Sequence, residues 1–302
     1  AKGRHLITVQ TEHPAVLEPC RYLEKLGFEV TYLTVDSHGL VNLADLAAAL
    51  RPETILVSIM AANNEIGVLQ PLAEIGQLCR QQGVLLHTDA AQALGKIPLD
   101  VEQMNIDLLS MTAHKVYGPK GIGALYLRRQ KPRVQLAPQI HGGGQERNLR
   151  SGTLATPQIV GLAKAVELAL AEQGAEQQRL RGLRNRLGKQ LQSLAGIHVN
   201  GHAHQCLPGC LSVSIEEVEA GALLLGVQPY IAVSSGSACA SAKPMPSHVL
   251  LALGHSATLA RATLRFGLGR WTTEAEVDQA AVRVIKVVSD LRAGQVAIAG
   301  NP

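Results

Sequence analysis

An acid and a lysine each follow an apolar run in the first half of the chain. Asp89 ends the run that begins at Val84, and Lys115 comes shortly after the run 108–112. Ligands of open parallel sheets bind beyond the carboxyl ends of the strands, so both side chains are expected to face one crevice. There a carboxylate could keep a pyridine nitrogen protonated while a lysine forms a Schiff base with the same cofactor. The alternative is that Asp89 caps a helix and Lys115 is a surface charge.

Alternating apolar and amphipathic segments must position these two residues. The spacing predicts strands at 5–8, 28–33, 55–60, 84–89, 108–112 and 123–127, with helices at 14–26, 43–50 and 72–82. Pro14 suits the first turn of its helix, and Asn42 is placed to cap the next one. Strand–helix–strand alternation predicts an α/β fold with a mostly parallel sheet and helices on both faces.

The second half of the chain has a different rhythm. A long helical segment, 156–194, is predicted to connect a large domain (1–155) to a smaller α+β C-terminal domain within 156–302. In that smaller domain we expect strands at 210–215 and 231–233, a helix at 219–225 between them, and a later helix, strand and final helix. Thr273 and Glu276 have the spacing of a capping box at the start of the final helix.

Composition narrows the function classes. The chain has 46% hydrophobic and 17% charged residues and a formal net charge of +4, which is typical of a globular protein. No apolar run reaches the length of a membrane span, and we expect no membrane association. The basic stretch 128–133 lacks interleaved aromatic residues, so a solvated turn is favoured over a nucleic-acid site.

The cysteines predict a reducing, cytoplasmic location. There are five cysteines, and an odd number at scattered positions argues against a framework of disulfides. Cys206 and Cys210 are four residues apart with His202 and His204 just before them, so a metal site is one interpretation. No second pair with metal-ligand spacing accompanies them, and we favour structural thiols and no metal.

The segment around the lysine resembles a known family. Residues 112–121 read Thr-Ala-His-Lys-Val-Tyr-Gly-Pro-Lys-Gly. This is similar to the cofactor-lysine signature of the class V aminotransferases of fold type I, and more narrowly of the cysteine desulfurases of iron–sulfur assembly. Further segments that resemble family signatures, in the family's order, are 11–13, 63–67, 89–92, 141–147, 150–153 and 234–239. The resemblance covers nearly the whole chain and implies pyridoxal 5'-phosphate as cofactor and L-cysteine as substrate.

The resemblance implies a role for each matching residue at the cofactor. Lys115 would bond to the cofactor and Asp89 would pair with its ring nitrogen. His13 would stack on the ring and shuttle protons, although a helix cap or a surface histidine is the alternative. Asn64 and Gln92 would contact the phenolic oxygen, Asn64 also the substrate carboxylate; without the resemblance, Asn63-Asn64 would be interpreted as a turn. The phosphate would be held by Thr112, by His114 and by Thr153 of the neighbouring subunit, which implies a homodimer.

Sulfur transfer falls to a cysteine in a loop of small residues. By resemblance, Cys239 in the segment 233–242 would be the nucleophile that takes sulfur as a persulfide and passes it to a sulfur-acceptor or scaffold protein. Arg265 would bind the substrate carboxylate as a bidentate pair, with Arg270 as its nearest rival. The other four cysteines match no signature and are interpreted as structural.

The sequence departs from the family at its start. The family pattern places a first helix, a strand and a Gly-Ala-Thr phosphate-binding turn before the first residue here. We therefore expect a species of these 302 residues alone to bind the cofactor weakly and to turn over poorly. Two other functions fit most of the same residues. One is a selenocysteine lyase or cystine carbon–sulfur lyase, which does not need Cys239, and the other is a truncated, non-catalytic partner subunit.

Overall fold

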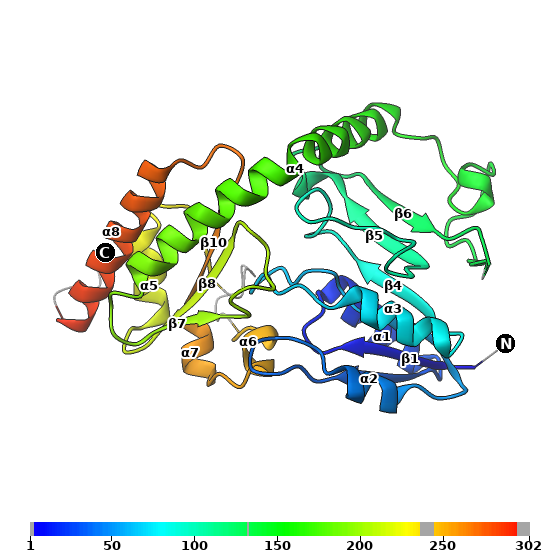
Figure 1. Cartoon of the computed structure of the whole chain (residues 1–302), viewed down its shortest axis with the longest axis horizontal. Coiled ribbons are helices and arrows are strands. Elements are labelled where there is room, and N and C mark those ends of the chain that lie inside the picture. The colour runs from blue at the N-terminus through cyan, green and yellow to red at the C-terminus, as the bar shows by residue number, and fades with distance from the viewer. Residues whose placement is uncertain (1–2, 132, 236–244, 295–302) are drawn as a thin grey trace, which may run out of the picture.

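Six strands form the larger of two sheets in the computed structural model, which describes residues 3–131, 133–235 and 245–294 (Figure 1). The sheet order is β2-β1-β3-β4-β5-β6. The neighbouring strands are parallel except for β6, which runs antiparallel to β5. The strands are β1 (His5–Val9), β2 (Glu29–Leu33), β3 (Thr54–Ser58), β4 (Leu85–Asp89), β5 (Leu108–Thr112) and β6 (Gly123–Leu127). The predicted α/β fold with a mostly parallel sheet is confirmed.

The helices that connect the parallel strands lie on the two faces of this sheet. They are α1 (Pro14–Lys25), α2 (Leu43–Ala49) and α3 (Leu72–Gln81). The chain crosses from β1 to β2 in one direction and from β2 to β3 and β4 in the other, and right-handed crossovers then put α1 opposite α2 and α3. Pro14 begins α1, and the Asn42 side chain accepts a hydrogen bond from the Ala44 amide, so both predicted helix starts are confirmed.

One long helix, α4 (Thr156–Leu191), extends from the larger sheet to the smaller one (Figure 1). The smaller sheet is antiparallel, with the order β7-β8-β10-β9. Its strands are β7 (Ile197–Asn200), β8 (Cys210–Ile215), β9 (Ser234–Ser235) and β10 (Thr263–Gly267), and its helices are α5 (Ala220–Val227), α6 (His248–Ala252), α7 (Ala257–Arg261) and α8 (Glu274–Arg292). The boundary at residue 155 stays a prediction.

Two details of the smaller unit differ from the sequence-based expectation. The predicted strand at 231–233 is wrong, because the pairing with β10 is made by Ser234 and Ser235 instead. The strand β7 was not predicted; it is only four residues long and follows directly on the long helical segment. The capping box at Thr273 and Glu276 is present at the start of α8. Across the described residues, no helix combines the length and the apolar content that crossing a membrane needs.

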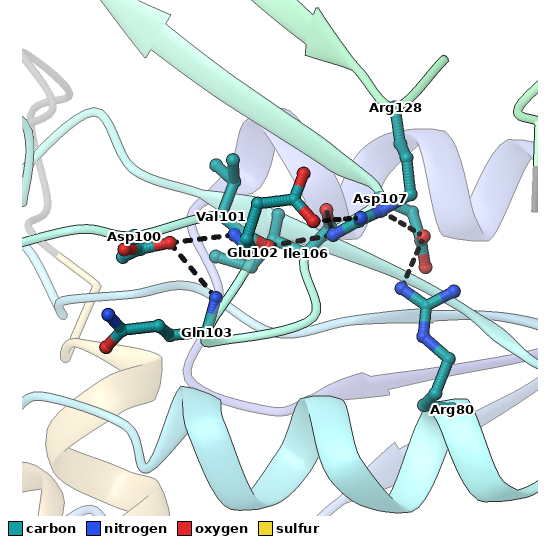
Figure 2. A network of polar contacts seen from close by, with 8 residues as sticks. All are labelled: Arg80, Asp100, Val101, Glu102, Gln103, Ile106, Asp107 and Arg128. Carbon is teal, nitrogen blue, oxygen red and sulfur yellow. Dashed lines mark hydrogen bonds and ion pairs between the residues drawn. The ribbon is translucent and has the colours of Figure 1, made fainter. Parts of the chain in front are cut away.

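A buried carboxylate fixes the beginning of β5, at the opposite end of the strand from Lys115. Asp107 is 1% exposed and forms ion pairs with Arg80 and with Arg128 (Figure 2). Its other oxygen accepts a hydrogen bond from the Leu86 amide at 2.9 Å, which ties it to β4. Arg128 also donates to Glu102 and to the main-chain oxygen of Ile106 (Figure 2). This network fixes the start of β5 beside β4. The opposite ends of these two strands lead to Asp89 (β4) and to Lys115 (β5).

Candidate active site

The ends of β4 and β5 deliver the predicted acid and lysine to the same edge of the sheet. Asp89 is the last residue of β4 and pairs in register with Ser110 of β5. β5 leads directly into a 3₁₀ helix (Ala113–Lys115), so Lys115 is exposed just beyond the strand end. Asp89 is half-buried, and its Oδ1 accepts a hydrogen bond from the Ala91 amide at 2.8 Å. That contact is the local capping predicted by the alternative interpretation, and it leaves the second carboxylate oxygen for another partner.

A cavity of about 220 Å³ lies between the two sheets and α4. It brings together four of the predicted site residues, which come from separate loops and strands and are Asn64, Gln92, Lys115 and Arg265. All four side chains carry N–H donors, and that of Lys115 is in addition a primary amine. A concave space lined by a few convergent polar groups is the usual setting of a ligand-binding or catalytic site.

Asn63-Asn64 had two interpretations from the sequence, a turn and a ligand contact, and the structure assigns one to each residue. The Asn63 side chain donates to the main-chain oxygen of Thr11 at 2.9 Å and accepts from the amide of Glu65 at 2.8 Å. It therefore makes the turn. Asn64 is half-buried and lines the cavity, so its side chain is left for a ligand.

Two arginines line the cavity, and only one of them is paired with carboxylates of the described residues. Arg270 forms ion pairs with Glu172 at 3.1 Å and with Glu176 at 3.0 Å. Arg265 donates through Nη1 to the main-chain oxygen of Asn64, and within the described residues no carboxylate lies within ion-pair distance of it. An anionic ligand would meet a neutralised charge at Arg270 and an available one at Arg265. The geometry therefore favours Arg265 as the anion-binding residue.

The other predicted residues lie outside the cavity lining, and Asp89 is among them, so the structure does not bring Asp89 and Lys115 to one cavity. His13 is exposed and caps α1, its Nδ1 accepting from the Ala15 amide at 3.1 Å. Thr112 Oγ1 and His114 Nδ1 form a hydrogen bond with each other, at 2.8 Å. Thr153 is exposed in the segment before α4. Cys239 lies outside the residues that the structure describes.

Two ionisable residues near the site, the half-buried Lys96 and the buried Glu12, were not predicted from the sequence. Lys96 lines the cavity, and burial lowers its pKa to about 8. Glu12 is fully buried, and burial raises its pKa to about 8, with the charge of Asp89 acting in the same direction. In the sequence, Lys96 is marked only by its place four residues after Gln92, and Glu12 only by its place directly before His13. Neither position reveals burial.

The residues on the cavity fit a pyridoxal phosphate. Lys115 supplies the amine that such a cofactor needs, the amides of Asn64 and Gln92 supply donors for its phenolic oxygen, and Arg265 supplies a cation for a substrate carboxylate. Asp89 ends the strand beside the one that leads to Lys115. A metal ion is a different matter: among the described residues, no cluster of three or more His, Cys, Asp or Glu side chains is placed to hold one.

Comparisons with known proteins agree with this fit. The family model for class-V aminotransferases matches residues 1–280. The chain is 52% identical, over 291 residues, to the cysteine desulfurase IscS of Cronobacter sakazakii, covering 96% of this chain and 72% of that protein. It is 54% identical to a mitochondrial cysteine desulfurase of Arthroderma benhamiae, again over 96% of this chain but only 58% of that protein. A solved structure described as a NifS-like protein superposes with a TM-score of 0.88 at 39% identity, over 96% of this chain and 76% of that one.

Proposed function

Because the chain belongs to the class-V aminotransferase family, and within it to the cysteine desulfurases, whose cofactor is pyridoxal phosphate, we propose that it converts L-cysteine to L-alanine and holds the released sulfur as a persulfide on Cys239. One observation carries the proposal. Lys115, Asn64, Gln92 and Arg265 come from four separate parts of the sequence and line one cavity. The bound cofactor would supply an electron sink for the substrate's α-carbon.

Substrate binding is assigned to Arg265 and Asn64. The guanidinium of Arg265 would form two parallel N–H···O bonds to the carboxylate of cysteine. The hydrogen bond from its Nη1 to the main-chain oxygen of Asn64 orients the guanidinium. The Asn64 side-chain amide would donate to the same carboxylate. Gln92 would donate to the cofactor's phenolic oxygen, and Asp89 would hold the proton on the pyridine nitrogen.

Proton transfer is assigned to Lys115 and His13. The amine of Lys115, when it is not bonded to the cofactor, would take the α-proton of the substrate, since Lys115 lies on the cavity wall. His13 would stack on the ring and return a proton to the substrate carbon. Its present contact uses only Nδ1, so Nε2 is left for this role. Thr112 and His114 would hold the phosphate.

Sulfur transfer requires a thiolate. Cys239 would attack the substrate sulfur. A sulfur–sulfur bond forms, the carbon–sulfur bond breaks, and its electron pair passes to carbon, which takes a proton to give alanine. The persulfide then passes to an acceptor thiol or to a scaffold protein of iron–sulfur assembly. The overall change is one cysteine and one thiol to one alanine and one persulfide.

Assembly into a homodimer is part of the proposal. Thr153, assigned to the phosphate of the neighbouring site, is exposed in a stretch that also exposes large apolar side chains. These are Ile140, Leu154 and Val160, with exposed fractions of 51%, 38% and 67%. Exposed apolar side chains close together are typical of a protein–protein interface. Light scattering of the purified chain should give twice the mass of one copy.

The experiment that tests the function follows both products. The chain is loaded with pyridoxal phosphate, mixed with L-cysteine without reductant, and alanine is quantified while intact mass spectrometry counts added sulfur. Wild type should form one alanine per site and carry extra sulfur on the Cys239 peptide, and Cys239→Ser should carry none. Sulfide release at the same rate in both proteins would instead indicate a lyase, and no alanine from a cofactor-loaded wild type would refute the proposed reaction.

A further inference from the structure

A second lysine shares the cavity with Lys115 and contacts a cofactor-binding residue. Lys96 Nζ lies 3.0 Å from Gln92 Oε1, and both side chains line the cavity. Lys96 Nζ donates to this oxygen, and the ammonium form of lysine has donors only, so in that form the oxygen end of the Gln92 amide must face Lys96. The NH₂ end is then the end left to face elsewhere. This contact settles an orientation that the shape of an amide leaves open.

The backbone around this pair is fixed against α4. Gly95 has a φ of +71°, and a Cβ built there would lie 2.7 Å from the Cβ of Ala169 on α4. The Gln173 side chain, one turn further along α4, donates to the main-chain oxygen of Ile97 at 2.9 Å. Lys96 is therefore held between two anchored neighbours. The direction in which its side chain leaves the backbone is therefore set by these two neighbours.

The charges around Lys96 leave Gln92 as its partner. Glu176 on α4, Cys210 at the start of β8 and Lys115 line the same cavity. Burial lowers the pKa of Lys96 to about 8, with the charge of Lys115 acting in the same direction and those of Cys210 and Glu176 in the opposite one. Glu176 is paired with Arg270 at 3.0 Å. Over the part of the chain that the structure describes, Lys96 has no carboxylate within ion-pair distance. Among the described residues, the hydrogen bond of its side chain goes to Gln92.

We propose that Lys96 is a positioning residue that fixes the amide of Gln92 so that its NH₂ group is presented to the phenolic oxygen of the cofactor. This inference rests on the proposed function, because it needs Gln92 at that oxygen. An N–H donor stabilises the anionic form of a phenolic oxygen and so lowers the pKa of the bound chromophore. If Lys96 is lost, the amide can turn its oxygen toward the phenolate, which removes the donor and adds repulsion.

The test is a pH titration of the visible absorption band of the cofactor-loaded protein. Lys96→Met, which keeps an unbranched apolar stem and removes the terminal donor, should raise the midpoint by about one pH unit, a tenfold change in the dissociation constant. Lys96→Arg keeps a donor and should stay near wild type. Lys164→Met, at an exposed lysine of α4 paired with Glu167, is the matched control and should not shift the midpoint.

A double mutant separates positioning from a direct effect of charge. If Lys96 acts only through Gln92, then Gln92→Leu and the Gln92→Leu/Lys96→Met pair should have the same midpoint. An equal further shift in the double mutant would overturn the proposal, because Lys96 would then act on the chromophore directly. An unchanged midpoint in Lys96→Met would overturn it as well.

A measurement without cofactor distinguishes failure of this inference from failure of the proposed function. In the cofactor-free protein labelled with ¹⁵N-glutamine, the side-chain amide signal of Gln92, identified by its loss in Gln92→Leu, should titrate near pH 8 with Lys96. It should not do so in Lys96→Met. A wild-type amide signal that stays unchanged over the pH range in which Lys96 itself titrates would contradict the Lys96–Gln92 contact, whether or not the chain binds the cofactor.

Discussion

Arg265 on β10 donates a hydrogen bond from Nη1 to the main-chain oxygen of Asn64, at 2.7 Å, across 201 residues of sequence. The contact joins the smaller sheet to a loop of the larger unit, and both residues line the cavity. One guanidinium thus has two tasks: it holds the two units together at the site, and it presents its remaining donors to a ligand.

Arg265→Lys should therefore weaken substrate binding. A lysine keeps the positive charge but loses the planar fork that matches a carboxylate. We expect the KM for L-cysteine to rise about tenfold, which corresponds to about 1.4 kcal/mol, with a smaller change in the cofactor band. Arg261→Lys, at an exposed arginine on α7, is the control. Steady-state kinetics decide the matter: an unchanged KM would move the carboxylate site to another residue.

Asp107→Asn should unfold the chain more easily without altering the chemistry. The change removes the carboxylate that Arg80 and the buried Arg128 share, and it leaves Arg128 paired with Glu102 alone. Breaking a buried pair costs up to about 3–5 kcal/mol, and the remaining contact with Glu102 offsets part of that loss. Urea unfolding should show that loss, while the partly exposed pair of Asp290 with Lys286 should matter much less in Asp290→Asn. Equal midpoints for the two variants would mean that the network contributes little.

Glu12→Gln should change how stability depends on pH. The pKa of Glu12 is raised from 4.5 to about 8, so between these values the folded state binds more protons than the unfolded state. The free energy of unfolding of wild type therefore falls as the pH rises through that window. Glutamine keeps the acceptor for the Met60 amide and has no charge to bury.

The variant should match wild type near pH 5 and exceed it near pH 8 by about 1–4 kcal/mol. Denaturant unfolding at several pH values measures the difference, and Glu18→Gln, at an exposed residue of α1, is the control. Curves for wild type and Glu12→Gln that run parallel from pH 5 to pH 8 would show that Glu12 is not protonated in the folded state.

The larger sheet was predictable because its strands are short apolar runs separated by clear helix signals. Pro14 and Asn42 mark helix starts by local chemistry alone, and the structure has them where the sequence predicts. The strand at 231–233 failed for the opposite reason. Its apolar residues suggested pairing, but the partner strand β10 pairs with the polar Ser234 and Ser235, a choice made by tertiary contacts.

The residue types of the site could be predicted from the sequence, but the burial, the pKa values and the ion pairs of those residues could not. Lys115 follows an apolar strand, which the sequence shows. The pKa of Lys96 and that of Glu12 depend on which residues of distant segments surround them, and a linear sequence does not contain that information. The same holds for the two arginines: only the structure reveals that Arg270 is neutralised by acids from α4 and that Arg265 is not.

The central claim is that Lys115 is the residue that bonds to the cofactor, and reduction followed by peptide mapping tests it most directly. The chain is incubated with pyridoxal phosphate, reduced with borohydride and digested, and the labelled lysine is located by mass spectrometry. The two informative competitors are Lys96, on the same cavity, and Lys120, five residues further along the chain. We predict the label on Lys115 and its loss in Lys115→Ala but not in Lys120→Ala; a label on Lys96, or scattered over surface lysines, would contradict the account.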